Sequence, residues 1–83
     1  TTSIKRIGRN RFLRNVLIAA GNSGDDNFVD DIIPLLIDES NLVRAMAVWS
    51  LFQLCDKSKF KKLKNSYYHS ERDKDVIKEW ELT

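Results

Sequence analysis

One stretch, SNLVRAMAVWSLFQLC from Ser40 to Cys55, constrains the fold of this chain more than any other. After its first two residues it has few clearly polar side chains: Arg44, Ser50 and Gln53. A helix that is apolar nearly all round must be covered on more than one side. In a chain of 83 residues, this predicts a helix in the middle of a stack, with Trp49 and Phe52 in the core.

The composition is that of one small globular domain over residues 1–83, with 42% hydrophobic and 31% charged residues. The longest apolar run is far shorter than a membrane span, and from the first residues we expect no signal peptide. We therefore expect a cytoplasmic protein without membrane contact. Because the chain does not begin with methionine, we expect it to be a fragment of something longer.

The chain has one cysteine, Cys55, and one histidine, His69. A single cysteine excludes an internal disulfide and a cysteine-based metal cluster, so we expect Cys55 to pack as a small apolar residue. His69 has no neighbours at ligand spacing, and we expect no metal site. No nucleophile, base or metal constellation is visible, so we expect no enzyme activity from this chain alone.

Hydrophobic periodicity predicts an all-α fold of about five helices, over residues 9–22, 26–37, 41–55, 57–68 and 73–82, after an extended lead over residues 1–8. In the first helix the predicted apolar stripe is Phe12, Val16, Ala19 and Ala20, widened by Leu13 and Leu17. Pro34 lies inside the second pattern, where it predicts a bent helix, or alternatively a break followed by a separate turn.

The segment GNSGD joins the first two predicted helices. Gly24 suits a left-handed position that closes the first helix, and Gly21 permits close approach of a neighbouring helix. Asp25 is expected to cap the second helix, as Ser40 is expected to cap the third. These structural roles explain most of the motif without a ligand, and leave Asn22 and Ser23 as polar contacts on an exposed turn.

An internal repeat relates the first and third predicted helices. FLRNVLIAAGNSGD aligns with LVRAMAVWSLFQLC at a shift of 30, and a further shift of 33 places Val76 under Val43. Helix pairs that repeat at this period, with a Val-Arg type of opening on the second helix, resemble HEAT-type repeats. We therefore expect a HEAT-like stack, a fragment of a right-handed α-solenoid, with one complete pair in the second and third helices.

IKRIGRNRFLRNVLIAAGNSGD, followed by a Pro-containing helix and LLIDESNLVRAMAVWSL, resembles the C-terminal part of bacterial epoxyqueuosine reductases. The resemblance covers nearly the whole chain and is strongest over residues 4–54. It implies an enzyme that reduces epoxyqueuosine to queuosine at the tRNA wobble position. It also implies cobalamin and two [4Fe–4S] clusters in an N-terminal catalytic domain that this chain lacks, because one cysteine cannot ligate the clusters. The HEAT-like domain is implied to hold tRNA.

The net charge of +2 conceals separate basic and acidic blocks. The basic N-terminal block is Lys5, Arg6, Arg9, Arg11 and Arg14, and a second basic block, Lys57–Lys64, follows the central helix. Between them lies an acidic block with Asp25, Asp26, Asp30, Asp31, Asp38 and Glu39. This alternation predicts an electrostatically polarised molecule.

Lysine and arginine clusters gain affinity for RNA through counterion release. With the resemblance, this predicts contact with a tRNA anticodon arm, and no DNA, through the residues Lys5, Arg6, Arg9, Arg11, Arg14, Asn15, Asn22 and Ser23. For Arg44 we expect instead a structural ion pair with Asp38. The lysine block is equally consistent with solubility and with RNA contact, and the Trp and Tyr side chains are expected to pack rather than stack on bases.

The second hypothesis is a protein-interaction scaffold without an RNA role. A HEAT-like stack presents a concave surface to a partner polypeptide. On this chain Asp26, Asp30 and Asp31 are the candidates to meet a basic partner. The expected partners are therefore tRNA and the protein's own catalytic domain under the first hypothesis, and a basic polypeptide under the second.

Overall fold

The structure, a computed structural model, describes residues 2–82 of the chain, with side chains from residue 5 onward. The described residues form helices and turns and no strand. The α-helices are α1 Thr2–Ser23, α2 Val29–Ile32, α3 Asn41–Leu54, α4 Lys57–Tyr67 and α5 Lys74–Leu82. Short 3₁₀ helices are Asp26–Phe28, Ile33–Ile37 and Tyr68–Ser70. The predicted all-α fold is confirmed.

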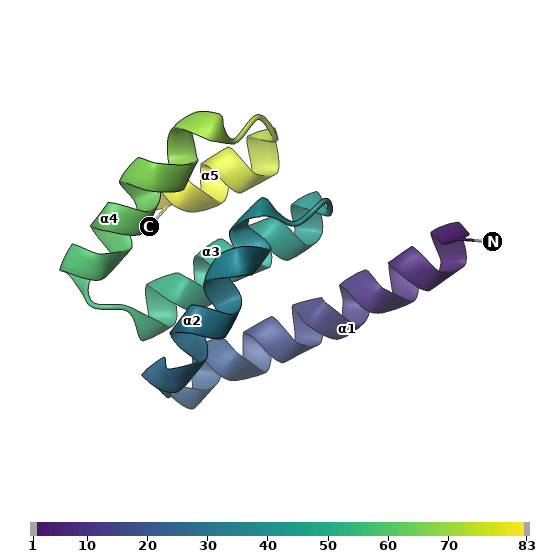
Figure 1. The fold of residues 1–83 in the computed structure, drawn as a ribbon, viewed down its shortest axis with the longest axis horizontal. Helices are drawn as coiled ribbons and strands as arrows, with labels where there is room; N and C mark the ends of the chain where they lie inside the picture. The colour runs from purple at the N-terminus through teal and green to yellow at the C-terminus, as the bar shows by residue number, and fades with distance from the viewer. Residues whose placement is uncertain (1, 83) are drawn as a thin grey trace.

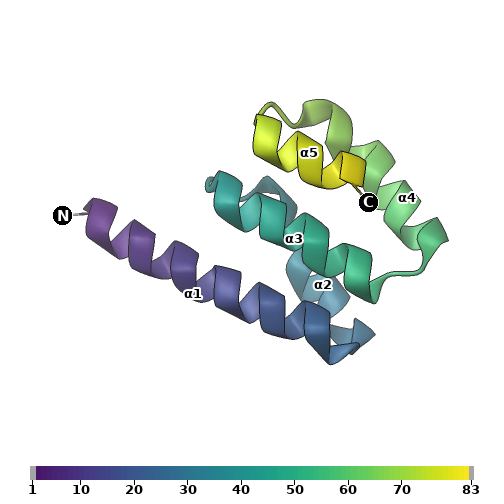
Figure 2. The same ribbon diagram turned by 180° about the vertical axis from the view of Figure 1, so that it is seen from behind.

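The helices lie in two layers. In Figure 2, α1, α3 and α5 run side by side, with α3 between the other two. Figure 1 shows α2 and α4 on the opposite face of this row. The assignment of these pairs to a right-handed HEAT-like solenoid stays a prediction.

The central position of α3 is confirmed. Its side chains at Val43, Ala47, Val48 and Leu51 have no exposed surface, because α1 packs on one side of α3 and α5 on the other. The prediction for Phe52 is wrong, since 44% of this residue is exposed. Phe52 lies at the C-terminal end of α3, where α4 covers it only in part.

The first helix differs from the prediction in length and in its packing face. α1 begins at Thr2, so the predicted extended lead is helical over the described residues. Leu17 and Gly21 of α1 are buried and Leu13 and Ala20 are half-buried. Of the predicted stripe, Leu13, Leu17 and Ala20 therefore face α3, whereas Phe12, Val16 and Ala19 do not. Phe12 and Val16 are exposed, because α1 is at the edge of its layer and α3 packs against its other side.

The second predicted helix is broken rather than bent. α2 ends at Ile32, and a 3₁₀ helix with Pro34 at its start continues to Ile37. Proline lacks the N–H group that an uninterrupted α-helix would require at this position. The alternative reading of the sequence, a break at Pro34, is therefore the correct one. Val29, Ile32 and Leu36 still face the core.

The later helices agree with the prediction within one residue at each end. Phe60 of α4 is buried, as are Val76 and Trp80 of α5. These three side chains close the core on the side of α3 away from α1. The Phe60 and Trp80 rings pack at a centroid distance of 5.4 Å.

Both predicted helix caps are confirmed. The Asp25 carboxylate accepts a hydrogen bond from the backbone N–H of Asn27, 3.0 Å away, and the Ser40 hydroxyl accepts one from Val43 at 3.4 Å. Gly24 has φ of 70°, the left-handed conformation predicted for the end of α1. Such side chains satisfy backbone donors at a helix start that have no partner within the helix.

The predicted close approach at Gly21 is also confirmed. A Cβ atom at this position would lie 2.6 Å from Cζ3 of Trp49 and 3.2 Å from the Ser50 hydroxyl oxygen. Glycine on α1 and a small residue on α3 thus bring the two helix backbones together.

We predict that Gly21→Ala lowers the free energy of unfolding by about 1–3 kcal/mol, because the Trp49 ring must move to admit the methyl group. Gly8→Ala is the matched control, since nothing lies within 4 Å of the added atom. That variant should raise stability by about 0.5–1 kcal/mol through helix propensity alone. Urea unfolding followed by circular dichroism at 222 nm measures both. Equal effects of the two substitutions would contradict the packing explanation.

Candidate nucleic-acid interface

Two of the predicted RNA-binding arginines are engaged within the protein. The guanidinium of Arg9 donates two hydrogen bonds to the Asp38 carboxylate, at 2.6 and 3.3 Å. Arg6 lies 3.8 Å from the Glu39 carboxylate, in a pair that is exposed on both sides. The acidic turn before α3 therefore neutralises one side of the basic helix.

The remaining cations of the N-terminal block keep their charge available. Arg11 and Arg14 are exposed, and among the described side chains no carboxylate forms an ion pair with either. Arg14 donates a hydrogen bond to the neighbouring Asn15 amide at 3.4 Å. Lys5 is likewise exposed, but it falls on the Arg9 side of the helix, four residues away.

Helix geometry places the free arginines on one side of α1. Residues 11, 14 and 22 follow at i, i+3 and i+11, and Asn15 is four residues after Arg11, so their side chains share a face. Arg9 precedes Arg11 by two residues and points to the opposite side of the helix. We call Arg11, Arg14, Asn15 and Asn22 the arginine face. It carries two positive charges and two amides that can both donate and accept hydrogen bonds.

Ser23 serves the turn rather than this face. Its hydroxyl donates to the Ala20 carbonyl at 2.5 Å and accepts from the Asp25 backbone N–H at 3.1 Å. These two bonds hold the segment that joins α1 to the next helix. Asn22 is exposed beside it. Of the pair that the sequence analysis proposed, Asn22 alone belongs to the arginine face.

The predicted ion pair between Asp38 and Arg44 is corrected by the structure. Arg44 contacts Asp38 through the backbone carbonyl, at 2.7 Å, while its guanidinium forms the ion pair with Glu71, with Nε 2.9 Å from Oε1. The Asp38 carboxylate is bound by Arg9 instead. The physical reason is reach: the turn before α5 brings Glu71 to Arg44, and α1 brings Arg9 to Asp38.

Glu71 is the acceptor that organises the turn before α5. Its carboxylate accepts from Arg44 and also from the backbone N–H groups of Arg72 and Asp73, both at 3.1 Å. Its side chain is 8% exposed. Arg44 thus links the turns that precede α3 and α5. Asn41 adds a second link between them by donating to Asp73 at 2.8 Å.

The second basic block lies apart from the first. Lys57, Lys59, Lys61 and Lys62 of α4 are exposed, and α3 lies between α4 and α1 in both views (Figures 1 and 2). The two basic blocks therefore do not form one continuous surface. Of the aromatic side chains considered for stacking on bases, Trp80 is buried, and Trp49, Tyr67 and Tyr68 are half-buried.

Sequence reasoning missed a groove between the end of α3 and α4, lined in part by Phe52, Phe60 and Lys61. The signal was present as an aromatic residue near the end of the central helix, followed by lysines around a narrow apolar stripe. The local pattern assigns the aromatic residue to the core and the lysines to the surface of the next helix, because nothing local shows that these side chains meet.

A scan against protein-family models and searches of curated proteins and of solved structures find no match to this chain. Among the described residues, none of the helices is long and apolar enough to cross a membrane. The same residues contain no group of three or more His, Cys, Asp and Glu side chains that could hold a metal ion.

We predict that Glu71→Ala lowers the free energy of unfolding by about 2–3 kcal/mol, because it leaves the half-buried Arg44 guanidinium and two backbone donors without their acceptor. Glu39→Ala is the control: it removes an exposed, loose pair and should change stability by about 0.5 kcal/mol or less. Urea unfolding measures the difference. Similar effects of the two variants would show that the Arg44–Glu71 link does not organise the turns.

The fold should also lose stability in acid. The Arg9 guanidinium holds the pKa of Asp38 below its usual range, and the Asn41 amide does the same for the pKa of Asp73. A carboxylate with a lowered folded-state pKa stabilises the fold fully above its unfolded value, about 3.9. That contribution is lost as pH falls through the lower folded value.

We therefore expect the contribution of Asp38 and Asp73 to the urea midpoint of unfolding to stay constant from pH 7 to about 5. As the pH drops below about 4, the midpoint should decrease. The double variant Asp38→Asn/Asp73→Asn should start from a lower midpoint and lose less on acidification. An unchanged acid loss in the double variant would contradict the assignment to these carboxylates.

Proposed function

We propose that this chain is the tRNA-binding module of an epoxyqueuosine reductase and acts in the cytoplasm. In this proposal the module helps to position tRNA while an N-terminal catalytic domain reduces epoxyqueuosine to queuosine at the wobble position. The observation that carries it is the arginine face of α1, where Arg11 and Arg14 are exposed and free of carboxylates. The family-like string RNVLIAAGNSGD, residues 14–25, lies on the same helix and the turn after it.

The chemistry of the arginine face suits an RNA backbone. A guanidinium offers a planar pair of donors that matches two phosphate oxygens, and it remains charged at all physiological pH values. Asn15 and Asn22 add neutral donors and acceptors for ribose hydroxyl groups or base edges. From Arg11 to Asn22 the face extends about 16 Å along the helix axis. This length accommodates several consecutive nucleotides.

Other features of α1 fit a place within a larger enzyme. Phe12 and Val16 are exposed, 66% and 45% respectively, and Ala19 continues the same stripe. In a stack of helix pairs, such a stripe packs against the preceding pair. We assign it to the contact with the catalytic part of the same protein, which places the arginine face on a helix held from two sides.

Cobalamin and the two [4Fe–4S] clusters of such an enzyme belong to the catalytic domain. The residues of this chain do not fit them: clusters require sets of cysteine thiolates, and the chain has one cysteine, half-buried in a groove. In this proposal the module is therefore not an enzyme by itself. Its contribution is RNA binding, without any bond made or broken.

The arginine face can be tested with a fluorescent tRNA anticodon arm at 50 and 200 mM salt. We expect the wild-type chain to bind with roughly micromolar affinity that falls as salt rises. Arg11→Glu/Arg14→Glu should weaken binding at least about tenfold and lower the salt slope by about 2, because two phosphate contacts are lost. Fluorescence anisotropy gives both quantities.

Lys74→Glu/Lys78→Glu is the matched control, because it changes the net charge equally on α5, on the other side of α3. It should reduce affinity by less than about threefold. Equal losses in the two double variants would show a general charge effect and contradict the site. Failure of the wild-type chain to bind the arm at 50 mM salt would contradict the proposed function and favour the protein-interaction scaffold.

A further inference from the structure

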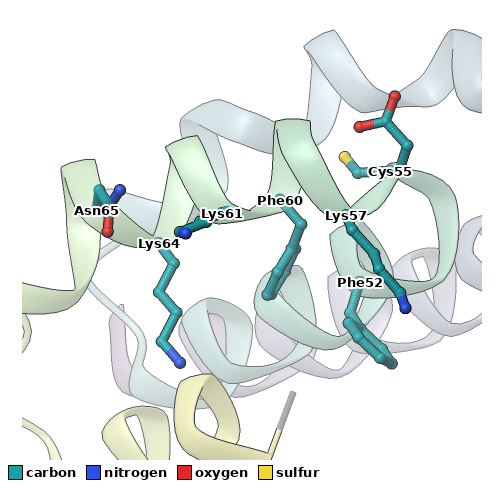
Figure 3. Close-up of a pocket in the computed structure, with 8 residues that line it drawn as sticks. Phe52, Cys55, Lys57, Phe60, Lys61, Lys64 and Asn65 are labelled. Carbon is teal, nitrogen blue, oxygen red and sulfur yellow. The ribbon is translucent and has the colours of Figure 1, made fainter.

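A groove lies between the C-terminal end of α3 and α4 (Figure 3). Figure 1 shows that α1, which carries the arginine face, lies on the other side of α3 from α4. The volume of the groove is about 770 Å³. The residues that line it are Phe52, Cys55, Asp56, Lys57, Phe60, Lys61, Lys64 and Asn65. A volume of this size is within the range of specific ligand sites.

The floor of the groove is apolar. The Phe52 and Phe60 rings meet edge to face, with centroids 5.4 Å apart and planes at 74°. Phe60 is buried, whereas 44% of Phe52 is exposed, so a large part of the Phe52 surface has no protein neighbour to cover it. Burial raises the pKa of the adjacent Cys55 thiol. An exposed aromatic surface with a polar rim is typical of a site that a partner covers.

The rim is basic. Three lysines of α4 line the groove at positions i, i+4 and i+7: Lys57, Lys61 and Lys64. They form a row about 10 Å long. Figure 3 shows Phe60 extending from α4 between the Lys57 and Lys64 side chains. The single acid in the lining, Asp56, accepts a hydrogen bond from the Lys59 backbone N–H at 2.7 Å as the cap of α4. The groove is thus an apolar strip flanked by positive charge.

We propose that this groove binds an acidic amphipathic helix of a partner protein. Apolar side chains of the peptide, at helical spacing, cover the exposed Phe52 ring beside the buried Phe60, while glutamate or aspartate side chains one turn apart meet Lys57 and Lys61. Such helices insert i, i+3, i+4 and i+7 anchors into grooves of this kind. Charge complementarity at the rim fixes the direction of the peptide.

The lining favours a peptide over RNA. A nucleobase inserted on Phe52 would need hydrogen-bond partners for its edge, and the lining offers it one neutral polar side chain, Asn65. Polar edges buried without partners cost binding energy. Leucine or phenylalanine anchors have no such requirement. The apolar floor is therefore best matched by apolar side chains, and the lysine row by carboxylates.

The probe for the test is a synthetic, fluorescein-labelled 18-residue helix with leucine and phenylalanine on one stripe and glutamates beside it. A peptide of the same composition with the apolar positions scrambled is its control. The full 83-residue chain should bind the amphipathic peptide with a Kd of roughly 10 μM and the scrambled one at least about tenfold more weakly. Equal binding of the two peptides would overturn the proposal.

Two double variants separate the groove from general charge. Lys57→Glu/Lys61→Glu should weaken peptide binding at least about tenfold, because both lysines line the groove. Lys59→Glu/Lys62→Glu changes the same net charge on the other side of the same helix and should weaken it less than about threefold. All four lysines are exposed, so both variants should fold. Equal losses would overturn the site.

Phe52→Ala should also weaken peptide binding at least about tenfold. Leu42→Ala, at an exposed position on the same helix, is its control and should leave peptide binding nearly unchanged.

Backbone amide shifts in NMR spectra report independently whether the peptide contacts residues 52–65. Shifts confined to other residues would overturn the proposal. The proposal would also be overturned if the chain bound oligouridylate or anionic vesicles but not the peptide, and if Lys57→Glu/Lys61→Glu abolished that binding. None of these outcomes depends on tRNA binding by α1.

Discussion

Burial of α3 on several sides at once is the constraint on which the rest of the structure depends. Val43, Ala47, Val48 and Leu51 leave no surface exposed, and burying a side chain of valine or leucine size contributes about 1.5–3 kcal/mol. No single neighbour can cover such a helix. α1 and α5 therefore pack on either side of it, and α2 with its 3₁₀ continuation packs across it. The close approach of Gly21 to Trp49 then fixes how deeply α1 is seated.

Charges on the turns complete this packing and decide which cations remain available. Arg44 joins the turn before α3 to the turn before α5 through Asp38 and Glu71, and Arg9 ties α1 to the first of these turns. Arginine suits such positions because its fork of donors serves two acceptors at once. Helix α1, which supplies Arg9 to the ion pair with Asp38, carries Arg11 on its opposite side. One basic segment is thus divided between a structural and an exposed role.

The arginine face of α1 and the groove beside α4 differ in chemistry as well as in place. The first presents guanidinium and amide groups along one face of a helix, which suits a phosphate backbone. The second is an aromatic floor with a lysine rim, which suits an amphipathic acidic helix. Because α3 lies between them, a ligand on one surface leaves the other accessible. The two proposals therefore describe a module that can bind RNA and a protein partner together.

The sequence by itself determined the helical class, the central helix, the caps at Asp25 and Ser40 and the close approach at Gly21. These features follow from periodicity and from local hydrogen-bond chemistry, which act over a few residues. Tertiary structure alone decided that Phe12 and Val16 of α1 are exposed, that Phe52 is exposed, and that Asp38 pairs with Arg9 and Arg44 with Glu71. Each depends on where a distant segment lies: a neighbouring helix covers only part of the wide apolar surface of α1, and an ion pair forms with whichever carboxylate the fold brings within reach.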